Sequence, residues 1–188
     1  MKTSDVDIKN GSPKTKKLVY TALMAGLLCI CSPITVPIGA IPLSLSSFAV
    51  YICAVLLGTC MGSVAVGVFV ALGTVGLPVF SGFVGGLSVI AGPTGGYIIG
   101  YIPCAFIVAY TVRVFGKKNW AYPLGMMLGT VVLYTIGTLW YSFVTSADPF
   151  TALCVCVLPF VLGDALKIAA ASFICNRVCG RTKIFNIV

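Results

Sequence analysis

The sequence has no histidine and very few ionisable side chains. Only 9% of its 188 residues are charged, whereas 59% are hydrophobic. Residues 18–112 include no Asp, Glu, Lys or Arg, and residues 119–176 include only Asp148, Asp164 and Lys167. Soluble domains carry about 25% charged residues, so this composition excludes an ordinary soluble domain. It predicts an integral membrane protein.

Motifs of the common enzyme classes are also missing. We find no nucleotide-binding loop, no nucleophile elbow and no set of metal ligands. The glycine-rich string at residues 92–96 contains no lysine and follows no predicted strand, so it is not a phosphate-binding loop. We therefore expect neither an enzyme nor a bound cofactor. If the chain is part of a transporter, ATP must be hydrolysed by other subunits.

Nine cysteines are present, and four of them form two Cys-x-Cys pairs, Cys29 with Cys31 and Cys154 with Cys156. Metal sites more often use Cys-x-x-Cys pairs or histidine, which this chain lacks. Cysteine also packs well as a small apolar residue on buried helices. We interpret the nine cysteines in that way, and they predict no metal site.

The apolar runs are continuous and long enough for helices that cross a membrane. A spanning helix needs about 20 apolar residues, so the chain has room for about six in one bundle. We expect an all-α bundle over residues 17–183, with an N-terminal tail at 1–16 and a C-terminal tail at 184–188. The predicted spans are approximately 17–34, 45–57, 63–77, 95–112, 120–141 and 148–175.

The connections between these spans are rich in glycine and proline. Residues 58–62 predict a tight uncharged turn, and residues 78–97 predict a long glycine-rich segment without regular structure. Asp148 and Pro149 resemble the start of a helix, with a capping residue before a first-turn proline. Pro159 and Gly163 are expected to bend the last span just before its ionisable pair.

Basic residues cluster beside the predicted spans, at 14–17, 113–118 and 177–183. Short clusters of this kind follow the positive-inside rule, so the net charge of +8 does not indicate a nucleic-acid partner. Six spans would place both termini and all three clusters in the cytoplasm of a bacterial cell. The glycine-rich segment and Asp148 would then face the outside of the plasma membrane.

Asp164 and Lys167 are the candidate functional pair. An ionisable group at membrane depth costs about 2.5 kcal/mol or more, and a spacing of three residues places both side chains on one helix face. One interpretation is a salt bridge that only holds helices together. Another is a polar pocket for a neutral or anionic small molecule. A proton relay is a third, weakened by the lack of histidine and of further carboxylates.

Several strings of the sequence resemble the BioY family, the biotin-binding S components of energy-coupling-factor (ECF) transporters. The resemblance runs from about residue 17 to residue 183, and its most specific parts are the GPTGGY string and the final Asp-x-x-Lys. The matching segments are residues 37–45, 76–80, 84–86, 92–97 and 163–167.

The resemblance implies a six-helix S component that captures biotin with high affinity. The substrate-binding set carried over by position is Gly85, Gly86, Tyr97, Asp164 and Lys167. Asp164 would accept from the ureido N–H groups of biotin, while Lys167 would serve either the ureido carbonyl or the carboxylate. Val84 and Ser46 complete the predicted set of seven, at two positions where some relatives carry asparagine and glutamine, and each change removes a possible hydrogen bond.

The same resemblance implies partner subunits. Small residues spaced by four on the first span, Ala22 and Gly26 here, would contact a transmembrane coupling subunit that works with two cytoplasmic ATPases. Three alternatives stay open at this stage. They are an S component for another vitamin, a stand-alone proton-coupled carrier, and a structural membrane subunit without a ligand.

Overall fold

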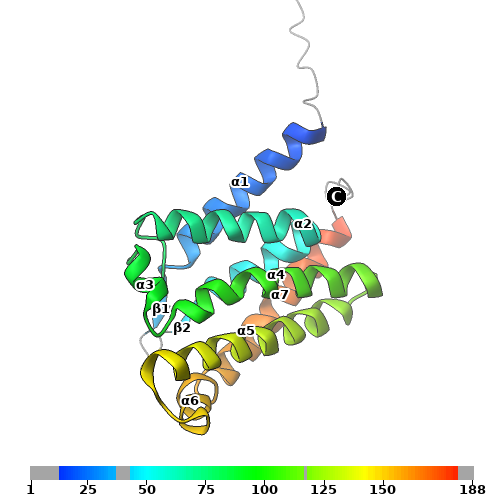
Figure 1. Cartoon of the computed structure of the whole chain (residues 1–188). Helices are drawn as coiled ribbons and strands as arrows, with labels where there is room; N and C mark the ends of the chain where they lie inside the picture. Colours follow the sequence, from blue (N-terminus) through cyan, green and yellow to red (C-terminus); the bar gives the residue numbers. More distant parts are fainter. Residues whose placement is uncertain (1–12, 37–42, 117, 182–188) are drawn as a thin grey trace, which may run out of the picture.

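The computed structural model describes residues 13–36, 43–116 and 118–181, and this part of the chain is mostly helical (Figure 1). The N-terminal segment 1–12, the whole predicted C-terminal tail at 184–188 and residues 37–42 of the loop after the first span lie outside the described residues. The elements are α1 (Pro13–Cys31), β1 (Thr35–Val36), β2 (Leu43–Ser44), α2 (Ser46–Thr74), α3 (Leu87–Ala91), α4 (Gly95–Phe115), α5 (Ala121–Thr145), α6 (Pro149–Cys156) and α7 (Val161–Arg181).

A sharp reversal divides α2 into two halves. Gly58 has φ 76° and ψ −174°, a conformation that is essentially restricted to glycine. A Cβ on Gly62 would lie 3.1 Å from the Cα of Ala54, although eight residues separate the two along the chain. The two halves therefore turn back on each other, which is the turn predicted at residues 58–62.

Three of the described helices are long and apolar enough to cross a membrane: α2, α4 and α5. Residues 150–156 of α6 and 161–179 of α7 qualify together as a fourth, with a bend of 50° between them. The predicted all-α membrane fold is confirmed. The count of six spans stays a prediction, because it requires α1 and each half of α2 to cross separately.

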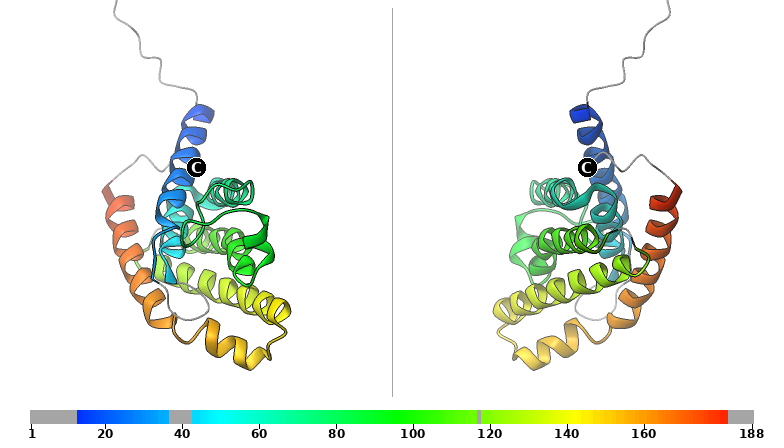
Figure 2. Two further views of the ribbon diagram at one scale, coloured as in Figure 1. Left: turned by 90° about the vertical axis from the view of Figure 1, so that its left-hand side faces the viewer. Right: turned by 90° about the vertical axis from the view of Figure 1, so that its right-hand side faces the viewer.

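The last predicted span is broken between α6 and α7. Asp148 precedes α6 as expected, although its side chain makes no capping hydrogen bond. The break covers residues 157–160 and includes Pro159, whose ring lacks the N–H that a continuous helix needs. Gly163, in contrast, lies inside α7, so the expectation that it contributes to the bend is wrong. Figure 2 shows α7 along one side of the bundle, continuing into α6 beneath α5.

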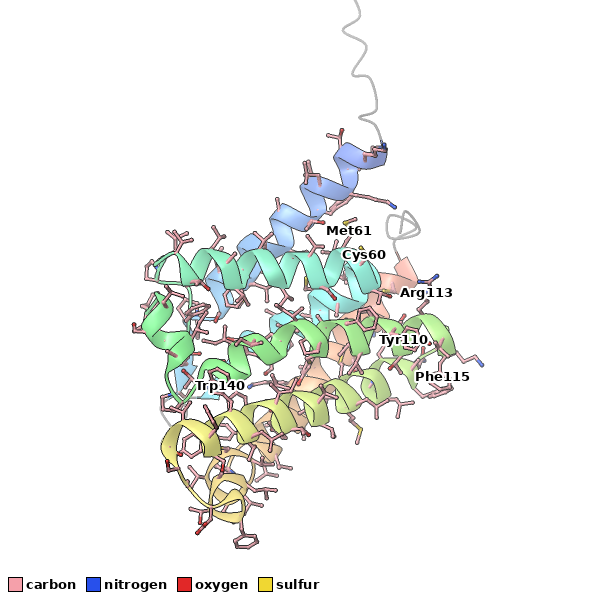
Figure 3. The ribbon with its side chains drawn as sticks, viewed as in Figure 1. Cys60, Met61, Tyr110, Arg113, Phe115 and Trp140 are labelled. Carbon is pink, nitrogen blue, oxygen red and sulfur yellow. The ribbon has the colours of Figure 1, made fainter. Side chains whose placement is uncertain are left out.

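The two ends of the bundle differ in character. The start of α1, the connection from α4 to α5 and the end of α7 lie towards one end, and α3, β1 and β2 lie towards the other (Figure 1). Arg113 and Phe115 are at the first end, far from Trp140 (Figure 3). This arrangement separates the basic segments from the glycine-rich segment. The assignment of one end to the cytoplasm stays a prediction.

The glycine-rich segment at residues 78–97 is more regular than we expected. It contains the short helix α3 and a β-bridge between Phe80 and Val84, so the expectation of a wholly irregular backbone is wrong. The Trp140 indole N–H of α5 donates to the Gly92 carbonyl at 3.0 Å, and the Gly82 N–H donates to the Pro33 carbonyl at 3.3 Å. These bonds attach the segment to α5 and to the end of the α1 region.

Candidate functional site

Asp164 and Lys167 form an ion pair on the first two turns of α7. The Lys167 Nζ lies 2.8 Å from the Asp164 Oδ1, and both side chains are largely buried. Asp164 is 6% exposed. The break at residues 157–160 sets the start of α7, and the Asp164 N–H donates to the Phe160 carbonyl at 2.8 Å. The predicted i,i+3 contact is therefore present in the structure.

Two hydroxyl groups from other helices complete the surroundings of Asp164. The Tyr134 hydroxyl of α5 donates to the Asp164 Oδ2 at 2.5 Å, and the Ser47 hydroxyl of α2 lies 3.5 Å from the Asp164 Oδ1. The Lys167 Nζ also donates to the Ser47 Oγ at 3.2 Å. Three helices thus meet at one carboxylate, which keeps the buried charge paired and hydrogen-bonded.

Tyr134 and Ser47 were not among the site residues predicted from the sequence. Tyr134 lies about two turns before Trp140, inside the apolar stretch of α5, where a tyrosine hydroxyl needs a partner inside the protein. That position could have identified it as a polar residue facing the bundle interior. No comparable pattern distinguishes Ser47 from its neighbour Ser46.

A pocket opens beside the ion pair. The space between its walls amounts to about 700 Å³ including open solvent at its mouth, and about 100 Å³ of it can hold the centres of water-sized molecules. Its walls come from β2, α2, the glycine-rich segment, α4, α5, α6 and α7. The lining residues are Ser44, Ser47, Phe80, Ser81, Val84, Val89, Thr94, Tyr97, Ile98, Tyr101, Leu133, Tyr134, Cys156, Phe160, Asp164 and Lys167.

Four of the seven predicted substrate-binding residues line this pocket: Val84, Tyr97, Asp164 and Lys167. The Tyr97 ring packs against α5 at Gly137, where an added Cβ would approach the ring to 2.4 Å. Its hydroxyl donates to the Cys156 carbonyl at 3.3 Å. Tyr97 is thus placed between α5 and α6.

Gly85 and Gly86 are adjacent to the pocket but are not among its lining residues. A Cβ on Gly85 would lie 2.2 Å from the Leu77 carbonyl oxygen. Gly86 has φ 103°, and its N–H donates to the Gly73 carbonyl at 2.7 Å. Gly85 is therefore required for close packing against Leu77, whereas Gly86 is required because its positive φ disfavours other residues.

Ser46 lies outside the pocket lining as well. It is fully buried, and its hydroxyl donates to the Ser32 Oγ at 2.7 Å while accepting from the Ser44 Oγ at 2.9 Å. This chain of hydroxyls connects the end of α1 to the start of α2. Ser46 therefore supports Ser44, which does line the pocket.

The predicted partner-contact residues are on the surface of α1. Ala22 and Gly26 are exposed, and a Cβ on Gly26 would have no atom within 4 Å. Leu23 and Ile30, on the same helix, are also largely exposed. An apolar surface with small residues is thus available to another membrane helix or to lipid.

Comparison with known proteins identifies the family. The sequence model of the BioY family matches residues 1–183. A probable biotin transporter BioY from Pyrococcus horikoshii is 36% identical over 169 residues, which cover 90% of this chain and 99% of the relative. The biotin transporter BioY from Thermotoga maritima is 34% identical over 164 residues, which cover 87% of this chain and 95% of the relative.

The fold has a counterpart among solved structures. A crystal structure of the S-component for biotin from an ECF-type ABC transporter superposes with a TM-score of 0.85 at 28% identity, covering 93% of this chain and 95% of the other. The expected S-component fold is therefore confirmed. With the family match over nearly the whole sequence, it follows that this multi-pass membrane protein belongs to the BioY family.

Proposed function

We propose that this chain captures biotin at the outer side of the plasma membrane as the substrate-binding subunit of an ECF transporter. The observation that carries the proposal is the hydrogen-bonded Asp164–Lys167 pair on the wall of an open pocket. Biotin's ureido group offers N–H donors and a carbonyl acceptor, which match a carboxylate and an ammonium group. The names of the relatives support the choice of ligand.

In this proposal the pocket residues have distinct roles. Asp164 accepts from the ureido N–H groups, and Tyr134 and Ser47 hold its carboxylate in position. Tyr97 and Val84 form the walls around the ligand. Gly85, Gly86 and Ser46 act indirectly, by shaping the segments that carry the lining residues.

The test is a binding measurement on the purified protein. We expect tight, saturable binding of radiolabelled biotin that excess unlabelled biotin displaces and that thiamine or riboflavin does not. Displacement by thiamine or riboflavin alone would assign the pocket to another vitamin. Lack of binding by all three would contradict the proposal.

We further propose that transport requires a transmembrane coupling subunit and two ATPase subunits, and that the α1 surface at Ala22 and Gly26 contacts the coupling subunit. Gly26→Leu should leave biotin binding by the isolated chain unchanged, because the position faces away from the bundle. It should strongly reduce uptake and copurification of the partners in cells. Gly67→Leu is the matched control, since a Cβ there also has no atom within 4 Å. Equal loss in both variants would contradict a specific role for this surface.

A further inference from the structure

Among the residues that the structure describes, the pocket offers its ligand a single cationic side chain. All lining residues fall within 44–101 and 133–167, and Lys167 is the only lysine or arginine in those ranges. Residues 37–42, which precede β2, contain no ionisable side chain either. A carboxylate on the ligand must therefore be bound by Lys167 or by uncharged donors.

Lys167 is already committed to another anion. Its Nζ lies 2.8 Å from the Asp164 Oδ1 and 3.2 Å from the Ser47 Oγ. A ligand carboxylate at the same Nζ would lie only a few ångströms from the Asp164 carboxylate. Two like charges a few ångströms apart repel strongly where the surroundings screen charge less than water does. The ion pair has no net charge, so a neutral group that both donates and accepts hydrogen bonds fits it better.

The remaining polar side chains of the outer part of the pocket are neutral hydroxyls. Ser81 and Thr94 are partly exposed and lie on the glycine-rich segment, whereas Asp164 is buried. The hydroxyl of Ser81 or Thr94 can donate to an amide carbonyl as well as to a carboxylate. Because this part of the pocket is partly exposed, water can supply further hydrogen bonds to either ligand group. Replacing a carboxylate by an amide there changes the hydrogen bonds only modestly.

From these observations, and resting on biotin as the ligand, we propose that the pocket recognises the neutral ureido head at the Asp164–Lys167 pair and does not recognise the carboxylate of the tail by charge. The pocket then also accepts neutral acyl derivatives, such as biotin amides. Its substrate class is defined by the head group, and the acid end of the ligand faces the uncharged outer part.

The experiment compares displacement of radiolabelled biotin from the purified full-length chain by biotin, by biotinamide and by an N-substituted biotin whose ureido group has lost one N–H. We expect biotinamide to bind within about tenfold of biotin. The N-substituted compound should bind at least about 100-fold more weakly, because the Asp164 acceptor is left unmatched. If biotinamide binds 100-fold or more weakly while biotin binds tightly, the proposal is overturned and the proposed function is retained. If biotin itself does not bind, the proposed function fails instead.

A variant gives a second test of the same inference. Lys167→Gln should lower the affinities for biotin and for biotinamide by the same factor, so that the ratio of the two affinities stays constant. If Lys167 binds the carboxylate instead, the variant would lower the affinity for biotin alone. Any preference of the protein for biotin over biotinamide would then disappear. Because the ratio is measured within one protein sample, partial loss of folded material does not affect it. If the variant does not fold, the comparison on the unaltered chain decides.

Discussion

Asp164→Asn should weaken biotin binding by about 100-fold or more. Hydrogen bonds to a charged group contribute about 1.5–3 kcal/mol each, and tenfold in affinity corresponds to about 1.4 kcal/mol. The substitution removes the charge that the ureido N–H groups need. In the unaltered protein the Lys167 Nζ lies 2.8 Å from the Asp164 Oδ1. The substitution leaves this ammonium group without its anionic partner. Equilibrium binding of radiolabelled biotin to the purified variant measures the effect.

Lys167→Ala tests the other half of the pair. Removing one member of a buried ion pair costs about 3–5 kcal/mol of stability, because the other charge stays buried without a partner. We therefore expect a lower melting temperature as well as weaker binding, by about 100-fold or more. Asp148→Asn is the matched control, since Asp148 is exposed and lies outside the pocket lining. Binding within about threefold of the unaltered chain for both pocket variants would contradict the proposed site.

Gly85→Ala should destabilise the protein and weaken biotin binding by about tenfold or more. The added Cβ would lie 2.2 Å from the Leu77 carbonyl oxygen and 2.8 Å from its carbon. Both are backbone atoms, so no change of rotamer relieves the clash. Overpacking of this kind costs about 1–3 kcal/mol. The segment between Leu77 and Gly85 carries three residues of the pocket lining, Phe80, Ser81 and Val84. A shift of this segment therefore moves all three.

Two measurements separate this explanation from a direct contact between Gly85 and the ligand. Displacement of the segment lowers the melting temperature of the ligand-free protein, whereas loss of a direct contact lowers the affinity alone. Gly67→Ala serves as the control, because a Cβ there has no neighbour within 4 Å and alanine favours a helix over glycine by about 1 kcal/mol. A Gly85→Ala protein with unchanged melting temperature would contradict the packing role.

The bundle and its centre were predictable because the membrane imposes strong constraints on sequence. Continuous apolar runs must be helical in lipid, so the positions of α4 and α5 followed from composition, and aromatic residues further marked the two ends of α5. Gly58 and Pro159 marked a reversal and a break, since each disfavours a straight helix. The ionisable pair stood out because charge is rare at this depth.

The role of the loop glycines depends on tertiary structure. That Gly85 and Gly86 bind the ligand stays a prediction, and the structure places them against Leu77 and Gly73, next to the pocket lining. A glycine permits either a close backbone contact or an approach to a ligand. Only the position of the neighbouring backbone distinguishes the two. The helix α3 was missed because glycine and proline on both sides of residues 87–91 favour turns.

By itself the sequence determined that this chain is a helical membrane protein of the BioY family with one ion pair, Asp164 and Lys167, in an otherwise nearly uncharged interior. The tertiary structure alone decided what surrounds that pair. Ser47 and Tyr134 reach Asp164 from positions 117 and 30 residues away along the chain. Helical periodicity specifies which residues share a face within one helix. It does not specify which faces of α2, α5 and α7 meet, because that depends on how the helices pack around the pocket.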